Sequence, residues 1–197
     1  MSNQRNKVRI IGGQYRRRLL SFPEAAGLRP TSDRVRETLF NWLGQDLTGR
    51  TCLDLFAGSG ALGFEAASRH ARRVLMVEKN RVTAESLRAN GVLLGATAVE
   101  IIQGDALGFL ARSRDTFDVI FLDPPFGSEL LAQVLPHVKA RLAPAGALYI
   151  ESGQEEDPGP EWVCLRQDRA GAVHYGLWQR ALTDGVLDLE PAANGPT

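Results

Sequence analysis

The sequence predicts an α/β fold in which helices cover both faces of a mostly parallel, seven-stranded sheet. From residue 51 onward, short apolar runs alternate with longer segments of helical periodicity. Strands that alternate with helices form βαβ units, in which the strands run parallel. Acidic residues and a glycine-rich turn directly follow the apolar runs. Because ligands bind at the carboxyl ends of parallel strands, these residues predict a ligand site on one edge of the sheet.

The chain begins with a basic extension, predicted over residues 1–45, that consists of a hairpin and a helix. Residues 8–22 are expected to form the hairpin, with Gly12 and Gly13 supplying the positive φ that its turn needs. Residues 31–44 are expected to be helical, because apolar side chains recur there at helical spacing after a proline.

Residues 46–183 are predicted to form the α/β domain, and residues 184–197 a disordered tail that contains proline and glycine. Parallel strands are expected near 51–56, 73–78, 99–103, 117–123 and 146–151. Helices are expected near 60–70, 80–94, 105–112 and 128–142. Two further strands, 162–168 and 173–180, are expected to be joined through Gly171.

The composition is ordinary for a globular protein, but the charge is unevenly placed. Residues 1–50 hold ten Lys and Arg against four Asp and Glu, and the rest holds thirteen against nineteen. This asymmetry predicts a polyanionic partner for the basic part. The two cysteines, Cys52 and Cys164, show no CxxC spacing, and no run approaches eighteen apolar residues. We therefore expect a cytoplasmic monomer without a disulfide, a metal or a membrane contact.

A candidate cofactor site follows the first three strands of the domain. An acid ends or follows each strand, and a glycine turn leads from the first strand into a helix, where backbone amides can approach a ligand. The acid after the second strand is placed for ribose hydroxyls, and the acid after the third for an adenine amine. The predicted cofactor contacts are Asp54, Phe56, Ala57, Gly58, Ser59, Gly60, Glu78, Lys79, Gly104, Asp105 and Ala106.

Two cofactors compete for this site. The spacing Gly58-x-Gly60-x-x-Gly63, followed by Glu78, fits a dinucleotide as well as S-adenosylmethionine. Asp54 favours S-adenosylmethionine, because an anion four residues before the first glycine suits an α-ammonium group better than a pyrophosphate. Each acid alone can be explained as a helix or turn cap. Their shared position at the ends of strands favours the ligand interpretation.

The most informative motif is Asp123-Pro124-Pro125-Phe126, which follows the apolar run 117–122. Proline fixes φ and lacks an N–H, so the corner is rigid and its carbonyls are free to accept hydrogen bonds. A carboxylate, a carbonyl and an aromatic face together suit the exocyclic amine of a planar base. We interpret these four residues as the catalytic corner of an enzyme that acts on such an amine.

The cofactor acids, the glycine turn and the Asp-Pro-Pro-Phe corner, in this order, resemble class I methyltransferases that act on amino groups. Residues 9–16, 27–37 and 172–176 narrow the resemblance to the RsmD family. It implies a Rossmann-like fold and the use of S-adenosylmethionine, with S-adenosylhomocysteine as the product. It also implies methylation of the N2 amine of a guanine in bacterial 16S rRNA, within an assembled or partly assembled 30S subunit.

The implied reaction agrees with the residues of the corner. The Asp123 carboxylate and the Pro124 carbonyl are expected to hold the amine hydrogens, while Phe126 stacks on the base. Asp123 is also a candidate acceptor for the proton that the amine loses, although the order of the steps stays open.

Arginines of the basic extension are expected to contact RNA phosphates. On a projecting hairpin they would follow the RNA backbone, and Arg36 would extend the patch toward the active-site edge. The predicted RNA contacts are Arg9, Arg16, Arg17, Arg18, Arg29 and Arg34.

Other functions remain open at this stage, because the corner motif alone does not distinguish guanine from adenine. A DNA adenine-N6 or cytosine-N4 methyltransferase shares the corner, but the chain lacks room for a separate DNA-recognition domain. A protein glutamine methyltransferase is expected to carry Asn at position 123. An NAD-binding oxidoreductase leaves Asp54 and the corner unexplained, and a non-catalytic RNA-binding module leaves the cofactor acids unexplained.

Overall fold

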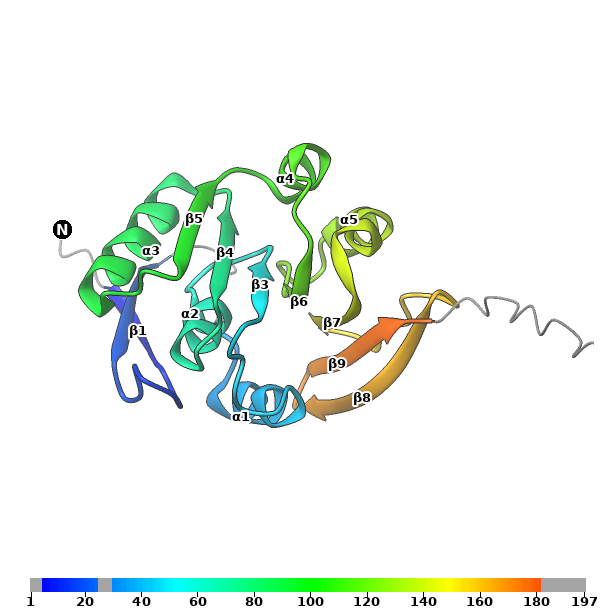
Figure 1. Ribbon diagram of the computed structural model, residues 1–197, viewed down its shortest axis with the longest axis horizontal. Coiled ribbons are helices and arrows are strands. Elements are labelled where there is room, and N and C mark those ends of the chain that lie inside the picture. The colour runs from blue at the N-terminus through cyan, green and yellow to red at the C-terminus, as the bar shows by residue number, and fades with distance from the viewer. Residues whose placement is uncertain (1–4, 25–29, 182–197) are drawn as a thin grey trace, which may run out of the picture.

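A seven-stranded sheet forms the centre of the computed structural model, which describes residues 5–24 and 30–181 (Figure 1). Its strands lie in the order β5-β4-β3-β6-β7-β9-β8. The first five strands in this order are parallel, and β9 runs antiparallel to both β7 and β8. The strands are β3 Thr51–Asp54, β4 Arg73–Glu78, β5 Val99–Gln103, β6 Phe117–Leu122, β7 Leu142–Ser152, β8 Trp162–Ala170 and β9 Val173–Arg180.

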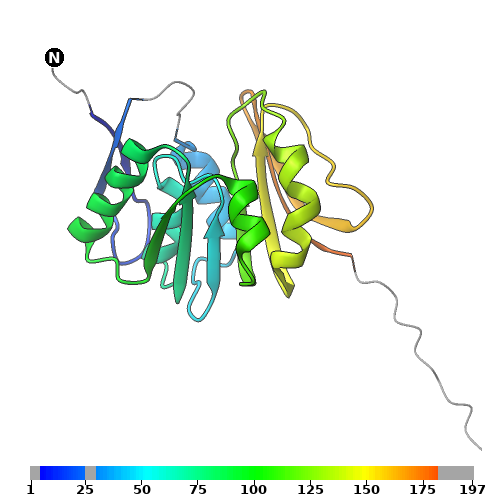
Figure 2. The same cartoon turned by 90° about the horizontal axis from the view of Figure 1, so that it is seen from above.

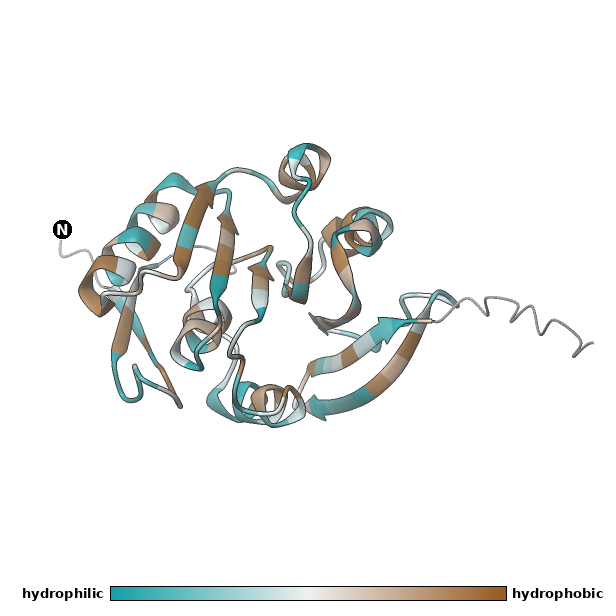
Figure 3. Cartoon of the chain, in the orientation of Figure 1, coloured by the Kyte–Doolittle hydropathy of each residue, from teal (hydrophilic) through white to brown (hydrophobic). Residues whose placement is uncertain are grey.

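Helices cover both faces of this sheet, as the two views in Figures 1 and 2 show. On one face lie α1 Asp33–Trp42, α2 Ala61–Ser68 and α3 Arg81–Leu94. On the other face lie α4 Ala106–Arg112 and α5 Leu130–Val138, which the 3₁₀ turn η1 Lys139–Arg141 extends. Because side chains alternate along a strand, each central strand supplies both cores. In Figure 3 the central strands are accordingly largely hydrophobic, whereas the helices show both colours.

Local signals explain where the helices begin and end. The Ser32 side chain caps α1 by accepting from the Val35 amide, and Asn80 caps α3 by accepting from the Thr83 amide. Helix α3 ends at Gly95, whose φ of 64° is the left-handed conformation that glycine adopts most easily. None of the helices within residues 5–24 and 30–181 is long and apolar enough to span a membrane.

The amino-terminal hairpin pairs β1 Arg5–Arg9 with β2 Leu19–Pro23 in a small separate sheet. The nine residues 10–18 connect the two strands. The prediction that Gly12 and Gly13 together form the turn of the hairpin is therefore wrong. Only the second of them, Gly13, has a positive φ, 75°. A Cβ atom at Gly13 would lie 1.8 Å from the Ser68 carbonyl oxygen, so the connection lies directly on the end of α2.

The sequence had suggested a projecting hairpin, but the hairpin packs against the domain. Its strand β2 lies against α3, where the Ser21 carbonyl accepts from the Ser86 hydroxyl and the Asn90 amide at 2.7 and 2.9 Å. Ile10 and Leu20 are fully buried in the same hydrophobic cluster as α1 and α2. The hairpin and the sheet therefore share one core.

The structure confirms the predicted α/β fold, with seven strands close to the expected positions. The main difference lies at 142–145, because the strand was expected to begin near 146. Instead β7 begins at Leu142, pairs with Phe117, and then shifts register before Ala147 pairs with Val119. The predicted tail 184–197 lies outside the described residues.

Candidate active site

The candidate site lies at the carboxyl ends of β3 and β6, which are neighbours in the sheet. The chain passes from β3 outward to β5 and then returns to β6 on the other side of β3, so the direction of winding reverses here. Such reversal points create the crevice in which open α/β sheets bind ligands. Asp54 ends β3, and Asp123 directly follows β6, so one acid flanks each side of this crevice.

Asp54 has one carboxylate oxygen without a partner in the described part of the chain. Its other oxygen accepts from the Gly63 amide at 3.0 Å, and the residue is only 1% exposed. Burial raises the pKa of the Asp54 carboxyl to about 7, and the charge of Glu78 adds to the rise. A buried anion with an unused oxygen is costly unless a cation pairs with it. The site is therefore suited to a positively charged ligand group.

The glycine turn after β3 is held close to the sheet. Gly58 and Gly60 have φ values of 50° and 79°, which other residues adopt only with strain. The Gly58 amide donates to the Glu78 carboxylate at 2.9 Å. At Gly63, an added Cβ atom would lie 2.4 Å from Met76, so glycine permits the close approach of α2 to β4. This packing fixes the turn beside Asp54.

The other predicted cofactor residues lie on the same edge, after β4 and β5. Glu78 accepts from the amides of Gly58 and Asn80, at 2.9 and 2.7 Å, so it braces the turn and borders the crevice. Asp105 caps α4 by accepting from the Gly108 amide at 2.7 Å, and this bond holds the pKa of its carboxyl low. The predicted residues Phe56, Ala57 and Ser59 lie in the turn, Lys79 follows β4, and Gly104 and Ala106 flank Asp105.

The catalytic corner offers two acceptors and an exposed ring. The hydrogen bonds of the described residues include none to the Pro124 carbonyl, whereas the Pro125 carbonyl accepts from both the amide and the hydroxyl of Ser128. Phe126 is 55% exposed, although it is a large hydrophobic residue. A Cβ atom at Gly153 would lie 3.7 Å from the Phe126 ring, so the ring stands over the end of β7.

Three residues at this corner were missed from the sequence: Thr31, Tyr149 and Glu151. The Thr31 hydroxyl donates to the Asp123 carboxylate at 3.1 Å. Glu151, on the neighbouring strand β7, is 4% exposed and accepts from the Tyr149 hydroxyl at 2.8 Å. The position of Glu151 at a strand end was a usable signal, because the other candidate acids were chosen by that rule.

The corner concentrates negative charge. Burial, followed by the charges of Glu151 and Asp54, raises the pKa of the Asp123 carboxyl well above its usual value, against the Thr31 hydrogen bond. Burial also raises the pKa of Glu151. A pyrophosphate would meet this charge unfavourably, whereas a ligand with positive groups would be stabilised by it. The electrostatics therefore disfavour a dinucleotide.

The predicted RNA-contacting arginines lie in two places. Arg9 forms an exposed ion pair with Asp33 at 3.0 Å, and Arg34 is exposed near the start of α1, on the side of the catalytic corner. Arg16, Arg17 and Arg18 are exposed in the connection 10–18, which lies on the end of α2 at the opposite edge of the sheet. Arg29 lies outside the described residues.

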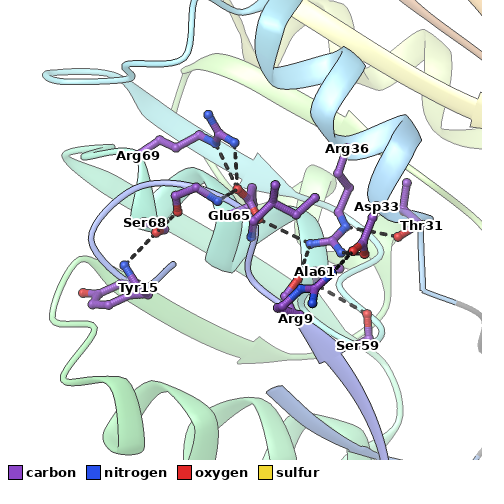
Figure 4. A network of polar contacts seen from close by, with 12 residues as sticks. Arg9, Tyr15, Thr31, Asp33, Arg36, Ser59, Ala61, Glu65, Ser68 and Arg69 are labelled. Carbon is purple, nitrogen blue, oxygen red and sulfur yellow. Dashed lines mark hydrogen bonds and ion pairs between the residues drawn. The ribbon is translucent and has the colours of Figure 1, made fainter. Parts of the chain in front are cut away.

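The sequence had suggested that Arg36 extends an exposed basic patch. This prediction is wrong, because the Arg36 side chain is fully buried. It pairs with Glu65 at 3.3 Å, and Arg69 pairs with the same carboxylate at 2.9 Å from the other side (Figure 4). Glu65 also accepts from the amides of Ile11 and Gly12 at 2.9 and 2.8 Å. We call Arg36, Glu65 and Arg69 the buried ionic cluster.

Solved structures share this architecture. The yhhF protein of Escherichia coli has a TM-score of 0.80 at 41% identity, and the match covers 89% of this chain and 98% of that one. An RNA methyltransferase of Salinibacter ruber in complex with S-adenosyl-L-homocysteine has a TM-score of 0.61 at 21% identity, covering 76% and 92%. The strand order, the site at the reversal point and these likenesses define a Rossmann-like class I methyltransferase.

Sequence relatives identify the family. The family described as "Conserved hypothetical protein 95" matches residues 8–179. Ribosomal RNA small subunit methyltransferase D of Escherichia coli K12 is 41% identical over 179 residues, which cover 88% of this chain and 90% of that relative. The protein of the same name from Haemophilus influenzae is 40% identical over 185 residues, covering 90% and 96%. This chain belongs to the RsmD family.

Proposed function

We propose that this protein transfers a methyl group from S-adenosylmethionine to the N2 amine of a guanine in 16S rRNA of the small ribosomal subunit. One observation carries the proposal: a carboxylate and an unused carbonyl, at Asp123 and Pro124, stand on the strand next to the one that ends in Asp54, whose buried carboxylate has an oxygen without a partner among the described residues. Membership of the RsmD family, with relatives named as small-subunit rRNA methyltransferases, supports the choice of RNA and of the small subunit.

The residues of the crevice fit S-adenosylmethionine. The unpartnered oxygen of Asp54 suits the α-ammonium group, and Glu78 suits the ribose hydroxyls. Asp105 has a carboxylate oxygen beyond its cap bond with which to accept from an adenine amine. When bound, this cofactor supplies an electrophilic methyl group on a positively charged sulfur, and the surrounding acids stabilise that charge.

The protein's own contribution to the reaction is position. An exocyclic amine is a weak nucleophile because its lone pair is delocalised into the ring. The Asp123 carboxylate and the Pro124 carbonyl hold the two N–H groups and thereby turn the lone pair out of the ring plane. The exposed ring of Phe126 stacks on the base and fixes its orientation. A base must leave its stack to reach this corner, which favours an unpaired nucleotide.

The basic residues support an extended RNA contact. Arg9 and Arg34 would bind phosphates close to the target base, and the 16–18 arginines would bind RNA at the far edge, about 12 Å away along α2. A folded ribosomal RNA could contact both sets at once. Guanine as the base rests on the family, and we propose a cytoplasmic monomer as the active form.

The proposal is tested with labelled S-adenosylmethionine and four acceptors: unmodified small subunits, naked 16S rRNA, 23S rRNA and duplex DNA. Nuclease digestion and chromatography then identify the labelled nucleoside. We expect N2-methylguanosine, formed from the small subunit or its RNA alone. Label in DNA, or in N6-methyladenosine, would refute the assigned substrate but keep the catalytic corner.

Binding of S-adenosylmethionine should strengthen as pH rises through about 7, because only the ionised Asp54 attracts an ammonium group. The affinity at about pH 6 should be about tenfold lower than at about pH 8, as measured by calorimetry. In Asp54→Asn the affinity should be weak and nearly constant over this range. A wild-type affinity that does not change with pH would remove Asp54 from the cofactor site.

The same carboxyl should affect stability in the opposite sense. Its pKa is raised from 3.8 in the folded protein, so the free energy of unfolding without cofactor should fall as pH rises from about 4 to about 7. The cofactor should then stabilise the protein most above pH 7.

A further inference from the structure

Asp123 and Glu151 lie side by side at the carboxyl ends of the neighbouring strands β6 and β7. Strands β6 and β7 are parallel with Leu122 opposite Ile150, which brings the next residues, Asp123 and Glu151, opposite each other. Side chains alternate along a strand, so Asp123 follows Phe121, and Glu151 follows Tyr149, onto the face covered by α1. Thr31, directly before α1, lies beside both carboxylates and donates its hydroxyl to Asp123 at 3.1 Å.

The groups that face this pair are nearly all neutral or acidic. Glu151 meets Tyr149 on its own strand and Tyr175 opposite it on β9. Asp123 meets the charge of Asp54 from β3. From the α1 side, the Arg36 guanidinium donates to the Thr31 carbonyl at 3.1 Å and not to either acid. Among the described residues, none of the lysines or arginines pairs with Asp123 or Glu151.

The proposed reaction needs a proton acceptor at this place. As the methyl carbon joins nitrogen, its bond to sulfur breaks and the electron pair returns to sulfur. The amine must then lose one proton: an N–H bond breaks, its electrons stay on nitrogen, and an O–H bond forms elsewhere. Asp123 already accepts that N–H in the proposed geometry. An isolated exposed aspartate would be a poor base for this step, because its proton affinity is low.

We propose, resting on the proposed function, that Glu151 is the positioning residue that makes Asp123 the proton acceptor, while the Thr31 hydroxyl donates to Asp123 from the α1 side. A second negative charge next to Asp123 makes proton uptake by Asp123 more favourable. The hydroxyl of Thr31 works against this effect, because it donates to the ionised form. Glu151 itself is buried beneath the corner and does not need to touch the base.

Glu151→Gln tests the role of the charge. Glutamine keeps the size of the side chain and can still accept from Tyr149, but it removes the negative charge. The single-turnover rate should fall at most about tenfold, and the acidic limb of its pH profile should move by about one unit toward lower pH. Thr31→Val should move the same limb in the opposite direction, because Asp123 loses a hydrogen bond that favours its ionised form.

The matched control is Glu156→Gln, which removes an equal charge nearby. Glu156 accepts from the Ser152 hydroxyl at 2.9 Å and has no bond to Asp123. Its pH profile should match that of the wild type. If Glu151→Gln changes only the rate or the stability, while the acidic limb stays in place, Glu151 has a structural role alone and the inference is wrong.

A measurement without substrate separates this inference from the proposed function. Titration of isotope-labelled Asp and Glu carboxyl carbons by NMR reports proton uptake at Asp123 directly. In Glu151→Gln, the Asp123 titration should move to lower pH, and in Thr31→Val to higher pH. If Glu151→Gln does not fold, the wild type still decides, because an Asp123 carboxyl that titrates in the ordinary range of aspartate would show no effect of Glu151. An Asp123 titration that Glu151→Gln does not move overturns the inference, whereas a moved titration in a protein that methylates no RNA overturns only the proposed function.

Discussion

Asp123→Ala is expected to lower the rate of methyl transfer by at least about 10³-fold while S-adenosylmethionine still binds. The substitution removes the carboxylate that we propose to hold the amine and accept its proton, but it leaves Asp54 and Glu78 in place. Single-turnover kinetics measure the first effect and calorimetry the second.

The stability of the Asp123→Ala variant should not fall. Asp123 is a buried acid whose pKa is raised by burial and by two neighbouring acids, so its charge costs folding free energy. Thermal unfolding at about pH 8 should therefore show an unchanged or higher midpoint. Asp123→Asn is the informative partner, because it keeps a carbonyl acceptor without a base. Full activity in either variant would contradict the assigned role of Asp123.

Glu65→Ala is expected to lower the free energy of unfolding by about 3–5 kcal/mol, because it removes the buried carboxylate that Arg69 and Arg36 share and leaves Arg36 with Asp33 as its acidic partner, at 2.6 Å. Arg36 is fully buried, and Glu65 is its buried counterion. The same change removes the acceptor of the Ile11 and Gly12 amides, which hold the 10–18 connection. Chemical denaturation of the purified protein measures the loss.

The control for Glu65→Ala is Glu85→Ala on α3. Glu85 also pairs with an arginine one helical turn away, Arg81, at 2.9 Å, but both side chains are exposed. Exposed pairs contribute little to stability, so denaturation should change hardly at all. If the two variants unfold alike, the buried ionic cluster does not hold the amino-terminal segment as we infer.

The fold could be predicted from the sequence because its signals are local. Apolar runs that end in acids predicted the parallel strands. Gly171 predicted the turn between β8 and β9, and its φ in that turn is 64°. The acids Asp54 and Asp123 were found in the same way, since position at a strand end is a property of the sequence. Their mutual placement across the crevice then followed from the rules of α/β sheets.

What could not be predicted depends on contacts between distant segments. Thr31 contacts Asp123, which lies 92 residues further along the chain, so the contact exists only once the chain before α1 has packed against the end of β6. Arg36 looked like one more member of a basic surface, because charge patterns do not reveal burial. Its partner Glu65 lies on a different helix, 29 residues further along the chain. Glu151, by contrast, could have been predicted from its position at the end of β7, and it was overlooked because no motif of the sequence surrounds it.

The buried ionic cluster has a consequence for how this family can be re-engineered. Arg36 donates to the Arg9 and Thr31 carbonyls as well as to Glu65, so one guanidinium ties the hairpin to the catalytic corner. The hairpin, which we propose to contact RNA, is thus not an exchangeable module. A chimera that borrows residues 5–23 from another member would have to import α1 and the facing side of α2 with them. Changes in target choice should therefore be sought at exposed positions such as Arg16 and Arg34, where the ties are absent.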